Sequence, residues 1–194
     1  MKKEYIILIG GGGHCKSVID VIEQQAKYEI AGIIDMPEKI NQEVLGYKII
    51  WKDSDIPELV KKYKNFHITL GQIKNPEPRI KLFNLLKQLN ANLPIIISPL
   101  AYVSRHAIIN EGTVIMHNVV VNANVIIGTN CIINSKALIE HDAVIGNHCH
   151  ISTGAIVNGG VKIGNNVFYG SGAVSKEYIS IPDNSFIKAN SIVK

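Results

Sequence analysis

The sequence predicts two domains of different architecture, an open α/β sheet followed by a solenoid built of short, flat β faces. Two observations support this. In the first half, short β-branched runs alternate with helical patterns. In the second half, one apolar position recurs every six residues without an insertion. The 194 residues suffice for two such domains, which we place at 1–99 and 100–194.

The first half contains the elements of a βαβ unit. Two helices are indicated by apolar residues at helical spacing, over 16–25 and 79–89. Four strands are indicated by short β-branched runs between turn signals, over 5–9, 30–35, 66–70 and 94–97.

The second half is an uninterrupted array of six-residue units. From Ala101 it reads AYVSRH, AIINEG, TVIMHN, VVVNAN, VIIGTN, CIINSK, ALIEHD, AVIGNH, CHISTG, AIVNGG, VKIGNN and VFYGSG. The third place is almost always Val or Ile, and the first is small or β-branched, so both are expected to face the core. Three faces make an eighteen-residue coil, which gives about five coils.

Two other places in the unit carry expectations of their own. The fourth place holds Gly128, Gly146 and Gly164, where we expect a turn with φ > 0. The second place points outward, yet seven consecutive units carry an aliphatic residue there, namely Ile108, Val114, Val120, Ile126, Ile132, Leu138 and Val144. A monomer should not expose that much apolar surface, and a three-sided prism closes most simply as a cyclic homotrimer.

Composition excludes several classes of function. The formal net charge is only +4 and the basic residues are scattered, so no nucleic-acid surface is expected. Three isolated cysteines indicate neither a disulfide framework nor a zinc site, and they favour a reducing compartment. The N-terminal apolar run is too short for a signal peptide or a membrane span, so we expect a soluble, cytoplasmic protein without membrane contact.

Several motifs together resemble one family. They are the glycine-His turn at 10–14, the strand ending at Asp35, LGQ at 70–72, LIEHD at 138–142 and HISTGAIVNGGVKIG at 150–164. With the six-residue repeat, they resemble the left-handed parallel β-helix (hexapeptide-repeat) acyltransferases, in particular the sialic acid O-acetyltransferase and bacillosamine N-acetyltransferase group. The resemblance implies a Rossmann-like N-terminal domain, acetyl transfer from acetyl-CoA to a sugar, and a trimer with active sites between adjacent β-helices.

His141 is the candidate general base, because taking a proton from a sugar amine or hydroxyl requires a pKa near neutrality. It lies outside the packed places of its unit, and Glu140 and Asp142 flank it as acids that can orient the imidazole. The resemblance agrees, since EHD matches the family's catalytic histidine and its acidic partner.

The resemblance also supplies candidates for binding acetyl-CoA. His150 interrupts the apolar second place and is implied to lie near the thioester carbonyl, with the backbone N–H of Gly154 as an oxyanion donor. Backbone contacts along a groove are implied for Ala155, Gly160 and Ala173. The chain lacks the G-x-P-A-K ending common in the family, so the usual terminal contact with the cofactor is not expected. His148 and His150 alternate along a strand and face opposite ways, so we expect no metal site.

The glycine turn after the first strand opens a helix, where backbone N–H groups favour phosphate. Its spacing is not GxGxxG, because Cys15 or Lys16 occupies the third glycine's place, and this disfavours an NAD enzyme. The resemblance instead implies a nucleotide-linked sugar here. The residues it assigns to that site are Gly12, Gly13, His14 and Asp35, and more weakly Gly71 and Gln72.

Three functions remain open at this point. The favoured one is N-acetylation of a nucleotide-activated amino sugar for surface-glycan synthesis. O-acetylation of a sialic-acid-type sugar would use the same base. A non-catalytic β-helix that binds a sugar nucleotide is the alternative from another class, and the EHD motif argues against it.

Overall fold

The computed structural model describes residues 3–194, which form two compact units. One contains the described residues up to Gly71 together with Glu77–Pro94. The other contains Gln72–Pro76 and Ile95–Lys194. The short segment Gln72–Pro76 therefore packs with the C-terminal unit, although the chain on both sides of it belongs to the N-terminal one.

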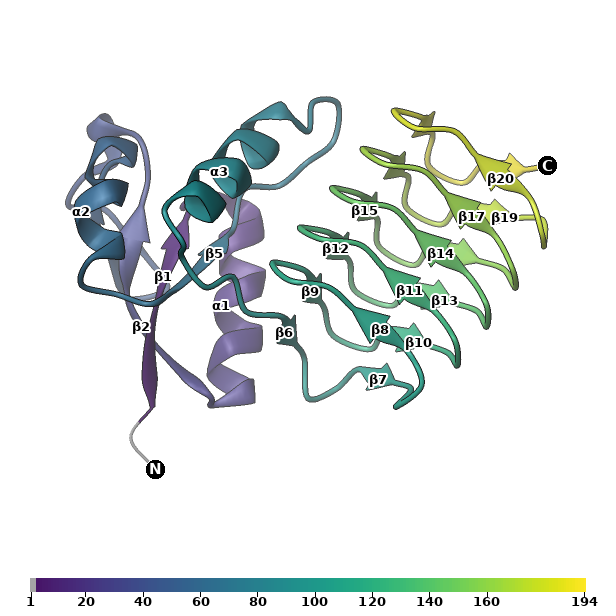
Figure 1. The fold of residues 1–194 in the computed structure, drawn as a ribbon, viewed down its shortest axis with the longest axis horizontal. Coiled ribbons are helices and arrows are strands. Elements are labelled where there is room, and N and C mark those ends of the chain that lie inside the picture. Colours follow the sequence, from purple (N-terminus) through teal and green to yellow (C-terminus); the bar gives the residue numbers. More distant parts are fainter. Residues whose placement is uncertain (1–2) are drawn as a thin grey trace. The chain divides into compact units, whose positions relative to one another are not determined.

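The N-terminal unit is an open sheet with strand order β3-β4-β2-β1-β5 (Figure 1). Four of its strands are parallel, namely β1 (Glu4–Ile9), β2 (Tyr28–Ile34), β4 (Tyr47–Trp51) and β5 (Asn65–Ile68), and β3 (Glu43–Val44) is antiparallel to β4. The helices are α1 (Gly13–Gln25), α2 (Ile56–Val60) and α3 (Glu77–Gln88), with 3-10 turns at Pro37–Lys39 and Asp53–Asp55. The predicted βαβ start of the chain is confirmed.

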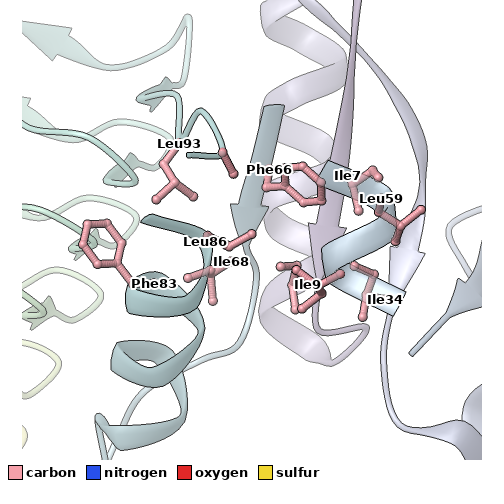
Figure 2. Close-up of a cluster of buried hydrophobic side chains, with 11 residues drawn as sticks. Ile7, Ile9, Ile34, Leu59, Phe66, Ile68, Phe83, Leu86 and Leu93 are labelled. Atoms are coloured by element: carbon pink, nitrogen blue, oxygen red, sulfur yellow. The ribbon is translucent and has the colours of Figure 1, made fainter. Parts of the chain in front are cut away.

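Side chains from one face of this sheet form its core with α2 and α3. Ile7 and Ile9 of β1 lie beside Phe66 of β5, and Leu59 and Leu86 come from the two helices (Figure 2). All five are at most 5% exposed, and full burial of one such side chain stabilises the fold by about 1.5–3 kcal/mol. This packing fixes the carboxyl ends of β1 and β5.

The strand expected over 94–97 does not belong to the N-terminal sheet. Ile96–Ile97 forms β6, which pairs with β9 (Val114–Ile115) of the C-terminal unit. The six-residue period explains this pairing, because Ile97 lies six residues before Val103 and occupies the same third place in its unit. The repeat therefore begins one unit earlier than expected, while Asn92 forms only an isolated bridge with Asn65.

The C-terminal unit is a parallel β-helix with three sheets (Figure 1). We name each sheet by one of its strands. The β13 sheet contains β7 (Tyr102–Val103), β10 (Val120–Val121), β13 (Leu138–Ile139), β16 (Ile156–Val157), β19 (Val174–Ser175) and β22 (Ile192–Val193). The β14 sheet contains β8 (Ile108–Ile109), β11 (Ile126–Ile127), β14 (Val144–Ile145), β17 (Lys162–Ile163) and β20 (Ser180–Ile181). The β15 sheet contains β6, β9, β12 (Ile132–Ile133), β15 (His150–Ile151), β18 (Phe168–Tyr169) and β21 (Phe186–Ile187).

Paired strands within each sheet are eighteen residues apart, as the sequence period predicts. Val120 pairs with Leu138, and Leu138 pairs with Ile156. The third-place side chains from Val121 to Ile163 are at most 3% exposed, and the first-place Cys131 and Cys149 are fully buried. The chain therefore has the predicted fold class, an α/β domain followed by a left-handed hexapeptide β-helix.

The turn geometry corrects one expectation. Positive φ occurs at the sixth place of every unit from Gly112 to Asn190, and not at the fourth place. Glycine is required at the fourth place because the backbones of successive coils approach each other closely there. A Cβ on Gly146 would lie 2.6 Å from the carbonyl carbon and oxygen of Gly164, one coil further along.

The outward second place is only partly exposed. Ile108 and Ile126 are 56% and 39% exposed, whereas Val114 and Ile132 of the β15 sheet are fully buried. The expectation of an exposed apolar column is therefore wrong for Val114 and Ile132 of the β15 sheet and is confirmed for Ile108 and Ile126, while Val120, Leu138 and Val144 are partly buried. No helix in the described residues 3–194 is long and apolar enough to span a membrane.

Candidate active site

His141 lies at the corner where the chain passes from the β13 sheet to the β14 sheet. Each coil contributes one turn to this corner, and we call the column of these turns the His141 corner. It consists of residues 104–107, 122–125, 140–143, 158–161 and 176–179. Side chains that are far apart in the sequence are stacked here at intervals of eighteen residues.

The imidazole of His141 is held by its neighbour in the same turn. Nδ1 lies 2.8 Å from Oδ2 of Asp142, and the two side chains are 55% and 50% exposed. Because Asp142 accepts, Nδ1 carries the proton and the other ring nitrogen, Nε2, is left as the basic atom. The expected orientation of the histidine by an acid is thus present in the structure.

Gly159, in the turn one coil further along, limits where the imidazole ring can lie. The imidazole lies over Gly159, where a Cβ would come within 2.9 Å of both Cε1 and Nε2. The N–H of Gly160 donates to the carbonyl oxygen of His141 at 2.9 Å. The motifs in the sequence did not single out Gly159, although its position eighteen residues after His141 is the signal that could have found it.

A cavity of about 380 Å³ opens at this corner. It is lined by residues of three successive turns, namely Glu140, His141, Asn158, Gly159, Glu177 and Tyr178. A larger cavity of about 480 Å³, lined by Lys3, Glu4, Tyr5, Lys62, Tyr63, Lys64 and Asn65, lies at the amino ends of β1 and β5. Ligands of open α/β sheets bind at the carboxyl ends, so the cavity at His141 is the better candidate site.

The acidic surroundings change the protonation of His141. The hydrogen bond to Asp142 raises the pKa of His141. Desolvation opposes this increase, and the charges of Asp142 and Glu140 add to it. Hydrogen bonds from Asn124 and His141 lower the pKa of Asp142, so this carboxyl stays ionised. A base with a raised pKa is a stronger proton acceptor, provided that the pH keeps it neutral.

His150 lies against the Gln72–Pro76 segment. It is buried, its Nδ1 lies 2.5 Å from the carbonyl oxygen of Gln72, and its Nε2 lies 3.2 Å from Nδ2 of Asn134. The ring also meets Phe168 edge to face, with centroids 5.3 Å apart. In turn, Nε2 of Gln72 donates to the carbonyl oxygen of His148 at 2.8 Å. His150 therefore anchors the Gln72–Pro76 segment on the β15 sheet.

The residues expected to contact acetyl-CoA do not form one group. Only Gly160 lies at the His141 corner. The N–H of Gly154 donates to Ser135 at 2.9 Å, which does not leave it available as an oxyanion donor. Ala155 and Ala173 are fully buried, and their N–H and C=O groups bond within the β-helix. The backbone N–H groups of Gly154, Ala155 and Ala173 are thus all bonded within the β-helix.

The glycine turn of the N-terminal unit is open where ligand binding was expected. Gly12 and Gly13 have no atom within 4 Å of an added Cβ, and Gly12 is the N-cap of α1 without a side-chain cap. A Cβ on Gly71 would lie 3.7 Å from Cβ of His14, so these two predicted residues are neighbours. Gln72 belongs to the C-terminal unit, where its Nε2 donates to the carbonyl oxygen of His148.

Asp35 ties this turn to the end of β2. Its Oδ2 accepts from the N–H of Gly11 at 2.7 Å, its Oδ1 accepts from Met36 at 2.7 Å, and Lys39 lies 3.0 Å from Oδ2. Burial opposes ionisation, but the hydrogen bonds from Met36 and Gly11 and the Lys39 ammonium lower the pKa of Asp35. The carboxylate is thus used to hold the turn.

Known proteins resemble both units. Residues 5–86 match the PglD N-terminal domain, and residues 106–141 match the bacterial transferase hexapeptide repeats. Comparison with curated protein sequences gives no significant match.

Two solved structures are similar over nearly the whole chain. One is a variant of perosamine N-acetyltransferase from Caulobacter crescentus in complex with CoA and GDP-perosamine. It has 28% identity and a TM-score of 0.91, over 97% of this chain and 88% of that chain. The other is the acetyltransferase domain of PglB from Neisseria gonorrhoeae, with 26% identity and a TM-score of 0.89 over 99% of this chain and 92% of that chain. The PglB domain is also solved in complex with acetyl coenzyme A.

Proposed function

We propose that this chain, which matches the PglD N-terminal domain and the bacterial transferase hexapeptide repeats, is an acyltransferase that transfers acetyl from acetyl-CoA to the amine of a nucleotide-linked sugar. The observation that carries the proposal is the His141–Asp142 pair beside an open cavity, in a chain that matches sugar N-acetyltransferases over nearly its full length.

In the proposed reaction, His141 acts as the general base. Nε2 accepts the proton that the sugar amine loses as its nitrogen bonds to the thioester carbonyl carbon, and Asp142 stabilises the resulting imidazolium through Nδ1. The C–S bond then breaks, and His141 passes the proton to the departing thiolate of CoA. Glu140 and Glu177 give the cavity a negative charge that favours an amino sugar over an anionic acceptor.

The corner also suits a thioester. When bound, acetyl-CoA supplies a carbonyl that is open to attack by the amine. Gly159 has no side chain to displace the imidazole, and within the described chain its N–H makes no inter-coil bond of the kind that engages Gly160. We assign to the N–H of Gly159 the oxyanion role expected for Gly154.

The two domains divide the work in this proposal. Residues 1–99 bind the nucleotide part of the sugar at Gly12, Gly13 and His14, where the first turn of α1 presents N–H groups to phosphate. Residues 100–194 carry the acetyl transfer. Asp35 and Gly71 support the glycine turn from the neighbouring strand ends.

We propose a homotrimer in the cytoplasm. The exposed outer side chains Tyr102, Ile108 and Ile126 are 60%, 56% and 39% exposed, and they suit an interface between copies of the β-helix. The three cysteines are buried and unpaired, as is usual in a reducing compartment. Sedimentation of the purified chain tests the assembly, and a stable monomer at micromolar concentration would overturn it.

The activity is tested by CoA thiol release from acetyl-CoA with UDP-linked and GDP-linked 4-amino sugars, free sialic acid and CMP-sialic acid as acceptors. We expect turnover on an amino sugar. Turnover on sialic acids alone would replace the proposal by O-acetylation. Absence of turnover together with absence of acetyl-CoA binding would favour a non-catalytic sugar-nucleotide protein. All three cysteines are buried, so a thiol reagent reports CoA and not the protein.

A further inference from the structure

In the coil below His141, the side-chain amide of Asn124 contacts Asp142, the acidic partner of the histidine. Asn124 stands eighteen residues before Asp142, and its Nδ2 donates to Oδ1 of Asp142 at 2.7 Å. The other carboxylate oxygen, Oδ2, faces Nδ1 of His141. Each oxygen of Asp142 therefore has its own partner, one from the turn below and one from its own turn.

The same turn also holds the second acid beside His141. Nδ2 of Asn122 donates to Oε2 of Glu140 at 2.9 Å. Both carboxylates that flank the histidine are thus bound by asparagines of one turn, and this turn lies at the opposite side of His141 from Gly159. The arrangement follows directly from the eighteen-residue coil, which stacks 122 under 140 and 124 under 142.

We propose that Asn124 is a positioning residue that acts through Asp142 to hold the imidazole of His141 in its catalytic orientation. This inference rests on the proposed function. The side chain of Asp142 is half exposed, so without a second partner its carboxylate turns freely about its side-chain bonds. A donor on Oδ1 fixes the plane of the carboxylate and keeps Oδ2 directed at Nδ1.

A purely structural role for Asn124 is the alternative, because its φ of +62° favours Asn or Gly whatever the side chain contacts. Asn166 provides the matched case. Its φ is +60°, and its Nδ2 donates to Oδ1 of Asn184, eighteen residues later, at 3.1 Å. Asn166 makes the same kind of inter-coil bond at a different corner, away from His141.

The charges around His141 are few enough for a titration to be interpreted. Asp142 and Glu140 lie on its own turn, Asn122 and Asn124 below it are neutral, and so are Asn158 and Gly159 above it. Glu177 and Tyr178 contribute the remaining titratable groups that line the cavity, and the corner also holds Lys176, Arg105 and His106 outside that lining. Replacing Asn124 by glycine changes none of these charges and suits a positive φ.

The test compares Asn124→Gly with Asn166→Gly in the full chain. The pKa of His141 is measured from the NMR signal of its Cε1–H, assigned by its loss in His141→Asn. We expect Asn124→Gly to lower this pKa, because the bond to Asp142 that raises it becomes less occupied. Asn166→Gly should leave it unchanged. An unchanged pKa in Asn124→Gly, or an equal shift in both variants, would overturn the proposal.

The kinetic measurement separates this inference from the proposed function. With an active acceptor, kcat of Asn124→Gly should fall about three- to tenfold, the range of one hydrogen bond, and the acid limb of its pH profile should move to lower pH. Asn166→Gly should match the wild type in both. If the pKa of His141 shifts but no acceptor is acetylated by the wild type, the orienting contact is supported and the proposed function is overturned.

Discussion

The imidazole of His141 lies over Gly159, one coil further along the β-helix, in the space that a side chain at residue 159 would enter. A Cβ at residue 159 would come within 2.9 Å of both Cε1 and Nε2 of the ring. The rotamer that gives His141 its hydrogen bond to Asp142 therefore depends on the absence of a side chain at residue 159.

Replacing Gly159 by alanine should displace the imidazole and lower the rate of acetyl transfer. A movement of about an ångström at a reacting group can cost about a hundredfold, so we expect a loss of about ten- to a hundredfold in kcat. His141 is exposed, so the melting temperature should change little. Wild-type kcat in Gly159→Ala would show that the ring does not need this position.

The pH dependence of kcat/KM should depend on Asp142. The base works only when neutral, so activity falls as the pH drops through the pKa of His141. Asp142 raises this pKa through its hydrogen bond to Nδ1. In Asp142→Asn the acid limb should move to lower pH, and kcat should fall as the ring loses its ionic partner. A limb that stays in place would mean that another group sets it.

Stability toward acid should depend on His67. Burial, together with the charge of Arg79, lowers the pKa of His67 from 6.5 to about 3 in the folded chain. The unfolded chain takes up a proton below pH 6.5 and the folded chain does not. The stability is therefore fully present above pH 6.5 and is lost as the pH falls toward 3. The loss from this group is about 1.4 kcal/mol at pH 5.5.

Urea unfolding of the wild type and His67→Gln at pH 7.5 and pH 5.5 measures this loss. The wild type should lose more of its free energy of unfolding between the two pH values than His67→Gln does. Equal losses would mean that His67 titrates alike in the folded and unfolded chains.

Close packing of the coils should make Gly146 intolerant of any side chain. A Cβ would lie 2.6 Å from the backbone of Gly164, and backbone cannot move aside as a flexible side chain can. We expect Gly146→Ala to lower the free energy of unfolding by at least about 1–3 kcal/mol. Gly13→Ala is the control, because residue 13 is open, and it should unfold like the wild type. Similar unfolding of Gly146→Ala and the wild type would show that the coils can separate.

The six-residue period predicted most of the β-helix because the residues that become buried recur with the same period. It indicated the buried third place and the stacking of Cys131 on Cys149. The period did not show why each glycine is needed. Gly160 has a positive φ and Gly146 has a close backbone neighbour, and the sequence alone does not distinguish these two cases. The start of the repeat at Ile96 was missed for a similar reason, because one short β-branched run fits either domain.

The candidate site was predictable where its chemistry lies within one turn and less so where it depends on stacking. His141, Asp142 and Glu140 are consecutive, and the motif identified them. Gly159 and Asn124 lie eighteen residues to either side, and only the coil geometry brings them to the histidine. The contact between His150 and Gln72 is not predicted by any periodicity, because Gln72 comes from outside the repeat.

The central claim is that His141 takes the proton from the attacking amine. It is tested most directly by the kcat of His141→Ala at saturating acetyl-CoA and amino sugar, beside His106→Ala. His106 is an exposed histidine of the same corner, two coils below. We predict that kcat of His141→Ala falls at least about a hundredfold, while His106→Ala keeps the wild-type rate. A His141→Ala enzyme that retains most of its rate would contradict the account.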